Sequence, residues 1–272
     1  MNIIKFLDDL SDQQLFETKG SRRDSFNQIK NVGKNFALAS IPFALAATSK
    51  KTAAATMSMS SAMFQASPID VLNFALTLEY LERDFYQMGM DTTGLIPESD
   101  RAVFGQILKH EVSHVNFLAT ALGDQAIAKP TFDFSGGPAG LTLNTFGDYP
   151  TFLALSQGFE DTGVRAYKGQ AGALIDSDAL LEYALQIHSV EARHASQVRR
   201  MRGEKGWINA NNNTLPIAFS GIYAGEQNTV QGGVNLSGMF NNYGGDAAIT
   251  EAFDEPLTMA EVNAIASVFI VS

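Results

Sequence analysis

Two copies of a glutamate followed three residues later by a histidine are the residues of this chain best suited to chemistry. They are Glu111-Val-Ser-His114 and Glu191-Ala-Arg-His194. Residues three apart on an α-helix share a face, so each pair would direct its carboxylate and its imidazole to one place. Carboxylate oxygen and imidazole nitrogen together suit iron, manganese or zinc rather than soft metals. One such pair is a weak signal because surface helices are rich in glutamate, but two copies indicate a metal site.

Each pair follows another helical pattern that carries one glutamate, Glu79 in the first case and Glu160 in the second. Both lie on apolar stripes, where a carboxylate is costly unless it is paired or bound to a metal. Single glutamates on two helices and Glu-x-x-His pairs on two others form the ligand set of a two-metal carboxylate site in a four-helix bundle. The predicted metal ligands are therefore Glu79, Glu111, His114, Glu160, Glu191 and His194.

The roles of these ligands differ in the prediction. The four residues of the two pairs are expected to be largely terminal ligands, and Glu79 and Glu160 to be bridging or terminal carboxylates. Any single member could instead be a solvated glutamate or a hydrogen-bonded core histidine. That alternative is much harder to sustain for all six residues in register.

Three more polar side chains are candidates for the same site. Tyr86 and Tyr167 come seven residues after the two single glutamates and share their helix faces. They could donate hydrogen bonds or electrons there, although amphipathic core tyrosines are an equal alternative. Glu82 lies on this face too and could be an additional ligand of one metal. His110 and His188 lie off the ligand face, so we expect them to be solvated or to hydrogen-bond to ligands.

The chain contains an internal duplication. Residues 78–86 match residues 159–167, each segment carrying a glutamate and a tyrosine seven residues later, and a Glu-x-x-His pair follows each segment. The second copy has Gly163 where the first has Glu82. The repeat unit is about one helix pair, as expected of a bundle built from two related hairpins.

On these residues the sequence resembles the ferritin-like superfamily, and more narrowly the ferritin-like domain family that includes plant desiccation-related proteins and exported bacterial homologues. The closer resemblance is carried by residues 74–82, 130–134, 159–169 and 190–194, and it covers about residues 67–205. It implies an all-α, ferritin-like four-helix bundle with a long crossover between helices two and three. It also implies a di-iron or di-manganese site with ferroxidase, oxidase, peroxidase or catalase chemistry. The narrower family has no well-defined activity, so the resemblance supports fold and site better than any one reaction.

Caps, glycines and apolar spacing predict where the helices lie. Ser67 before Pro68, and Asp148 before Pro150, mark two helix starts, and Gly89 is expected to stop the first helix. The predicted bundle helices span residues 68–88, 97–123, 148–170 and 177–202. Residues 124–148 have no helical period, and a crossover along the bundle requires a long connection there.

The segment before the bundle, residues 1–66, is expected to be a targeting signal and a linker. Arg22-Arg23 resembles a twin-arginine export motif, although Phe26 comes one position late. The apolar run 36–47 has 12 residues, which is too short to span a bilayer and fits a signal peptide. A buried helix after a surface arginine pair is the alternative. Export implies the periplasm or cell envelope, with the twin-arginine export machinery as a partner of the folded, metal-loaded precursor.

The segment after the bundle is rich in asparagine and glycine over residues 206–250, which suggests loops and a short β-hairpin. Thr258-Met-Ala-Glu261 is a capping box that predicts a short final helix packed on the bundle. The expected organisation is an export signal at 1–47, a flexible linker at 48–66, the bundle at 67–205 and a C-terminal extension at 206–272.

Composition limits the function classes. The 272 residues, 45% of them hydrophobic, are enough for one large globular domain with appendages. The chain has no cysteine, which excludes thiolate metal sites, iron–sulfur clusters and disulfides. Its net charge of −10 disfavours nucleic acid as a partner, because phosphates require a basic surface.

The ligand pattern predicts a protein that holds two iron or manganese ions and acts as an oxidoreductase with oxygen or peroxide, and the resemblance implies a ferroxidase, peroxidase or catalase-like reaction. The alternative is a non-catalytic envelope protein of stress or desiccation, since a stabilising or vestigial metal site would support the fold without turnover. Iron storage is a third reading, but nothing in the sequence indicates a cage-forming surface. Iron versus manganese, the substrate and a homo-oligomeric state stay open.

Overall fold

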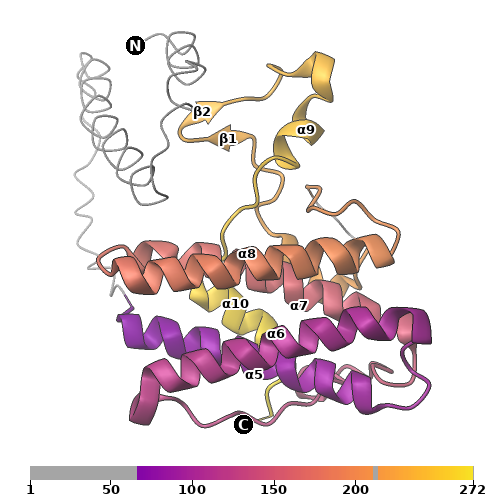
Figure 1. Cartoon of the computed structure of the whole chain (residues 1–272). Helices are drawn as coiled ribbons and strands as arrows, with labels where there is room; N and C mark the ends of the chain where they lie inside the picture. Colours follow the sequence, from indigo (N-terminus) through magenta and orange to yellow (C-terminus); the bar gives the residue numbers. More distant parts are fainter. Residues whose placement is uncertain (1–65, 211–213, 272) are drawn as a thin grey trace, which may run out of the picture. The chain divides into compact units, whose positions relative to one another are not determined.

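The structure is a computed structural model that describes residues 66–210 and 214–271 (Figure 1). The predicted export signal, residues 1–47, lies outside the described residues, and so does all of the predicted linker, residues 48–66, except Ala66. Among the helices that are described, none is long and apolar enough to cross a membrane.

Four long helices form the bundle that the sequence predicts. α5 (Pro68–Asp91) and α6 (Glu98–Leu122) pack as one hairpin, and α7 (Tyr149–Gln170) and α8 (Asp178–Met201) pack as a second (Figure 1). The connection between α6 and α7 is long and contains short 3₁₀ turns and an isolated β-bridge from Phe132 to Ile270. The all-α class, the helix order and the long connection are therefore confirmed.

The remaining elements are short and lie mostly in the C-terminal extension. In chain order they are η1 (Gly123–Gln125), η2 (Gly137–Ala139), η3 (Ala171–Leu174), η4 (Ile217–Tyr223), β1 (Val230–Gln231), β2 (Val234–Asn235), η5 (Asn241–Tyr243), α9 (Asp246–Thr250) and α10 (Met259–Ala266). The two strands pair antiparallel, with Val230 opposite Asn235. They form the short hairpin that the sequence suggests, and α10 is the predicted final helix.

The helix starts follow the predicted caps. At α5 the Ser67 side chain accepts a hydrogen bond from the backbone N–H of Asp70 at 3.2 Å, and the Asp70 carboxylate accepts one from the backbone of Ser67. At α7 the Asp148 carboxylate accepts from the backbone N–H of Thr151 at 2.9 Å. These bonds satisfy N–H groups that the first turn of a helix leaves without a partner.

The first helix ends later than predicted. Gly89, expected to stop it, lies inside α5, which continues to Asp91. A Cβ at Gly89 would lie 2.4 Å from the Phe152 ring of α7. The absence of a side chain at Gly89 therefore permits a close approach of two helices, and the prediction of a stop was wrong because packing, not backbone conformation, requires this glycine.

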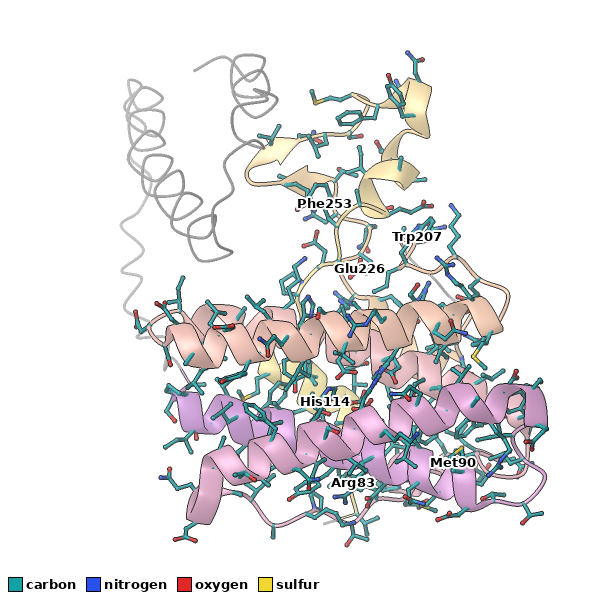
Figure 2. The ribbon with its side chains drawn as sticks, in the orientation of Figure 1. Arg83, Met90, His114, Trp207, Glu226 and Phe253 are labelled. Atoms are coloured by element: carbon teal, nitrogen blue, oxygen red, sulfur yellow. The ribbon has the colours of Figure 1, made fainter. Side chains whose placement is uncertain are left out.

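The C-terminal extension is anchored on the outer side of α7. The buried guanidinium of Arg165 forms an ion pair with Glu226 at 2.8 Å, and it donates hydrogen bonds to the carbonyls of Glu255 at 2.6 Å and Ala224 at 2.5 Å. Glu226 lies where the extension meets the bundle (Figure 2). With the bundle on one side and the extension on the other, all residues from 155 to 167 of α7 are buried. The helix that carries Glu160 is thus held from both sides.

A second buried ion pair joins the two helices of the second hairpin. Asp161 of α7 accepts a hydrogen bond from Arg199 of α8 at 2.5 Å and another from the hydroxyl of Tyr223 at 2.7 Å. Asp161 and Arg199 are each 1% exposed. Because a buried charge is costly without its partner, this pair fixes how α7 and α8 lie against each other and against η4.

Candidate metal centre

The six predicted ligands lie together in the middle of the bundle. Glu79 comes from α5, Glu160 from α7, and α6 and α8 contribute one Glu-x-x-His pair each. All four carboxylates are 0% exposed, and the side chain of His114 is 11% exposed. His114 points into the space between the helices (Figure 2). The structure therefore brings all six predicted ligands together.

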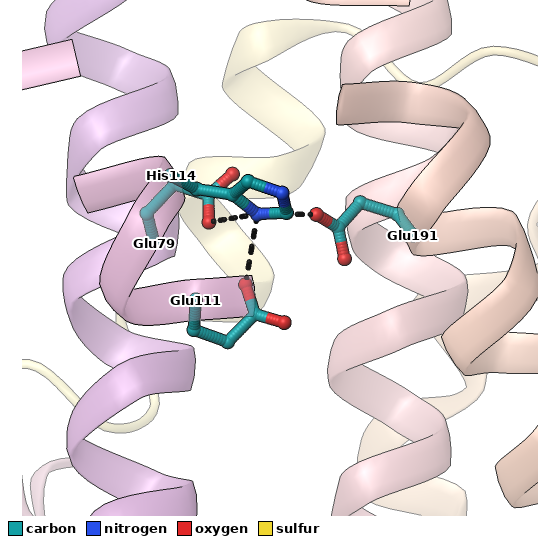
Figure 3. A group of neighbouring side chains, drawn as sticks. All are labelled: Glu79, Glu111, His114 and Glu191. Carbon is teal, nitrogen blue, oxygen red and sulfur yellow. Dashed lines mark hydrogen bonds and ion pairs between the residues drawn. The ribbon is translucent and has the colours of Figure 1, made fainter. Parts of the chain in front are cut away.

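The ligand atoms form two groups, each centred on the Nδ1 atom of one histidine. His114 Nδ1 lies 3.2 Å from Glu79 Oε2, 3.2 Å from Glu111 Oε2 and 3.0 Å from Glu191 Oε1 (Figure 3). The second group is built the same way. His194 Nδ1 lies 3.0 Å from Glu111 Oε1, 3.3 Å from Glu160 Oε2 and 3.1 Å from Glu191 Oε2.

Glu111 and Glu191 belong to both groups. Each directs one carboxylate oxygen to His114 and the other to His194, whereas Glu79 and Glu160 each take part in one group only. The sequence predicts Glu79 and Glu160 as bridging or terminal carboxylates and the paired residues as largely terminal; here the paired glutamates are the ones whose oxygens are divided between the two groups. The two Glu-x-x-His helices face each other, so their glutamates meet at the centre and the single glutamates lie on either side.

The two tyrosines cross between the hairpins. Tyr86 of α5 donates a hydrogen bond to Glu160 Oε1 of α7 at 2.5 Å, and Tyr167 of α7 donates one to Glu79 Oε1 of α5 at 2.5 Å. Burial and then the neighbouring glutamate charge raise the pKa of Tyr86 and that of Tyr167 well above the usual value, so both hydroxyls keep their protons. Each tyrosine therefore orients the carboxylate that belongs to only one group, which supports the predicted hydrogen-bonding role.

Two other residues named from the sequence also border the site. Glu82 is 3% exposed, and its Oε1 lies 3.4 Å from where a Cβ of Gly163 would be. Burial and then the charges of the surrounding glutamates raise the Glu82 pKa well above its usual range. Glu82 is outside both groups of ligand atoms. Its carboxyl borders the centre beside the space left by Gly163, and its role as an extra ligand stays a prediction.

His110 contacts a predicted ligand directly. Its Nδ1 lies 2.8 Å from His194 Nε2, the rings stack with centroids 5.1 Å apart, and its Nε2 lies 2.7 Å from the Gln106 amide. This chain of contacts holds the side of the His194 ring that faces away from the carboxylates. His188, in contrast, has a buried Nδ1 without a hydrogen-bond partner among the described residues and lies in neither ligand group.

The charges of the centre favour cations. Among the described residues no lysine or arginine forms an ion pair with the four ligand carboxylates, and their partners are the two histidines. Burial opposes charge on His114, but the carboxylates of Glu111, Glu191 and Glu79 that surround its Nδ1 outweigh burial and raise the His114 pKa to about 12. Burial raises the pKa of Glu160 to about 7, against the lowering effect of His194. At neutral pH the protein alone holds protons that a metal ion would have to displace.

The donor atoms of the centre suit metal ions. Glu111 Oε1, Glu160 Oε2 and Glu191 Oε1 are buried and have no hydrogen-bond partner among the described residues, yet each lies within 3.3 Å of a histidine Nδ1. One nitrogen cannot donate to three oxygens at once, so hydrogen bonding alone leaves these oxygens unsatisfied. Each group offers one imidazole nitrogen and three carboxylate oxygens, a set suited to iron, manganese or zinc.

Sequence reasoning missed the contacts that support the centre from outside. The ion pair of Asp161 with Arg199 and that of Arg165 with Glu226 join residues far apart in the chain. Asp161 directly follows Glu160, and this second acid in a predicted bundle helix was the available signal. Nothing in the local pattern indicated its partner.

Fold and centre together define a ferritin-like bundle with a buried carboxylate–histidine cluster that could hold metal. The family of the ferritin-like domain matches residues 67–204, just over half of the chain, and the chain belongs to this family. The match covers all four bundle helices and ends where the C-terminal extension begins. No curated protein matches the chain.

Proposed function

We propose that the chain holds two iron or manganese ions and is an oxidoreductase that uses oxygen or peroxide. The observation that carries the proposal is the sharing of Glu111 and Glu191 between the two histidine groups. A site for a single ion does not need two carboxylates that divide their oxygens between two separate imidazoles. Glu79 and Glu160 would complete the two ligand sets, one ion each.

The chain's own groups would hold and tune the ions. Tyr86 and Tyr167 fix the orientation of Glu160 and Glu79 by their hydrogen bonds, and His110 holds the far side of the His194 ring. When bound, two redox-active ions in such a site supply electrons to oxygen or peroxide. The buried surroundings exclude water from the reaction.

Metal analysis followed by oxidant assays tests this proposal. Protein loaded with ferrous or manganous ions should hold about two ions per chain, and oxygen or peroxide should change its optical spectrum repeatedly over several cycles of reduction. The variant His114→Ala/His194→Ala should lose both the ions and the spectral change. Unchanged metal content in this variant would place the ligands elsewhere.

A non-catalytic role is the second candidate, favoured by the closure of the centre. All four carboxylates are fully buried, and structural metal sites are closed whereas catalytic ones keep an open position. In that case the ions would stabilise the bundle of an envelope stress or desiccation-related protein. Metal that raises the melting temperature but is spectrally inert to both oxidants would support this second role.

Export to the periplasm or envelope is part of the proposal and rests on the sequence of residues 1–47 alone. The Arg22-Arg23 pair and the short apolar run after it support twin-arginine export. That route would deliver a folded bundle that already contains its ions.

A further inference from the structure

The internal duplication lets each end of the metal centre be compared with the other. Glu79 and Glu160 are 81 residues apart, which relates α7 to α5, and His114 and His194 are 80 residues apart, which relates α8 to α6. The ligands and both tyrosines obey these two offsets. Equivalent positions beside the two tyrosines that hold different residues therefore show where the two ends of the centre differ.

The end of the centre at Tyr86 is filled by three aromatic rings. Phe85 lies with its ring centroid 5.2 Å from that of Tyr86, Phe104 at 5.9 Å and Phe152 at 6.3 Å. All three phenylalanines are 0% exposed. Tyr86 is thus enclosed by buried aromatic rings.

The end at Tyr167 lacks these rings. The positions equivalent to the three phenylalanines, in the same order, hold Ala166, Ala184 and Val71. All three of these smaller residues line one pocket, and Tyr167 lines it too. The replacement of three phenylalanines by two alanines and a valine therefore opens a pocket where the other half of the duplication is packed.

The pocket is lined by residues of all four bundle helices and lies next to Tyr167, which borders the metal centre. Tyr167 separates the two, because it lines the pocket and its hydroxyl donates to Glu79. The pocket is also bordered by Tyr183, which is 45% exposed. Its lining therefore includes both a partly exposed side chain and one that donates a hydrogen bond to a predicted metal ligand.

The apolar lining and small size of the pocket favour a small apolar molecule. The lining is apolar except for Tyr167, Tyr183 and Gln170, and the space has room for roughly one water-sized molecule. A buried water requires two to four polar partners, and the Tyr167 hydroxyl already donates to Glu79. A small apolar molecule needs no such partners and gains contact with the surrounding carbon atoms.

We propose that this pocket, which we call the Tyr167 pocket, binds one apolar molecule of diatomic size, and that dioxygen is its occupant. Its link to the ions rests on the proposed function, but binding in the pocket does not require the ions. The pocket favours dioxygen over the polar peroxide as the oxidant. It also makes the two halves of the centre unequal, since only the half with Glu79 and His114 lies beside it.

Xenon, an apolar probe, tests the binding site itself. Crystals of metal-free protein under xenon pressure should show a xenon atom beside Tyr167. Ala184→Phe restores the phenylalanine of the other half and should remove that atom. The control Leu185→Phe adds the same ring at the next residue of α8, whose side chain is 48% exposed, and should keep it.

A wild-type protein without xenon beside Tyr167, or a folded Ala184→Phe protein that still binds it, would overturn the inference. If Ala184→Phe does not fold, Ala184→Leu fills the same pocket with a smaller side chain, and its melting temperature shows that it is folded. Loss of xenon in either folded variant supports the inference.

Oxidation rates separate this inference from the proposed function. In ferrous protein, Ala184→Phe should slow oxidation by dioxygen and leave oxidation by peroxide unchanged, and Leu185→Phe should change neither. Equal slowing of both oxidants would overturn the role of the pocket while leaving the metal function intact. Protein that binds xenon but no metal would overturn the proposed function and leave the pocket intact.

Discussion

Replacing the shared carboxylate Glu111 by glutamine should weaken both metal sites at once. Glu111 Oε1 faces His194 and Oε2 faces His114, so the variant Glu111→Gln alters both ligand sets. Glu79 contributes to one set only, so Glu79→Gln should weaken one site. The two variants remove the same chemical group, and the structure predicts different results because one group is shared.

The expected effect can be estimated from ligand-linked stability. At a free metal concentration of 100 times the dissociation constant, each site stabilises the fold by about 2.7 kcal/mol. Two sites then give about 5 kcal/mol, which for a domain of this size raises the melting temperature by roughly 10–20 °C. Glu79→Gln should lose about half of this rise, and Glu111→Gln most of it.

In the metal-free protein, Glu111→Gln should change the melting temperature in the opposite direction. Burial, and then the neighbouring charge of Glu191, raise the pKa of Glu111 well above its usual range. A carboxyl whose pKa is raised by folding destabilises the fold at any pH above its unfolded pKa. Removing it by Glu111→Gln should therefore raise the melting temperature at pH 7 when a chelator is present.

Differential scanning calorimetry with manganous ion and with chelator measures both effects. Glu98→Gln is the matched control, because Glu98 lies on the same helix with its side chain 96% exposed, and the variant should leave the metal-dependent rise unchanged. If Glu111→Gln loses no more of the metal-dependent rise than Glu79→Gln does, the shared role of Glu111 is wrong.

Three further predictions follow from other parts of the molecule. The surrounding carboxylates raise the His114 pKa to about 12, and a metal ion can bind only the deprotonated nitrogen, so metal affinity should rise with pH between about 6 and 8, by roughly tenfold per pH unit for each proton displaced. Calorimetric titration in buffers of different ionisation enthalpy counts the protons released. An affinity that does not depend on pH would contradict this displacement. Arg199→Ala should destabilise the fold by about 3–5 kcal/mol, since it leaves the buried charge of Asp161 without its partner, and urea unfolding measures the loss. Changing Arg22 and Arg23 to Lys should keep the precursor in the cytoplasm, as seen by fractionation, because lysine keeps the charge and loses the forked guanidinium; normal delivery to the envelope would show that the pair is incidental.

The parts of this protein that local spacing determines were predictable from the sequence. A glutamate and a histidine three residues apart share a helix face whatever surrounds the helix, so Glu111 with His114 and Glu191 with His194 could be grouped at once. The capping box at Thr258 likewise needs only its own turn, and α10 begins where it predicts.

The parts that depend on how the helices are placed could not be predicted. Which carboxylates are shared depends on which two helices face each other across the centre, and spacing within one helix carries no information on that. The prediction that Gly89 stops a helix was wrong because this glycine is needed for the close approach of Phe152, which belongs to the other hairpin. The contact of His110 with His194 has the same origin, since the two residues are 84 positions apart.

Anomalous diffraction from crystals of protein loaded with manganous or ferrous ion would show whether Glu111 and Glu191 are shared between two ions. We expect two metal peaks in the middle of the bundle, one beside His114 Nδ1 and one beside His194 Nδ1, with Glu111 and Glu191 each contacting both. A single peak, or two peaks bridged by Glu79 or Glu160 instead, would contradict this sharing.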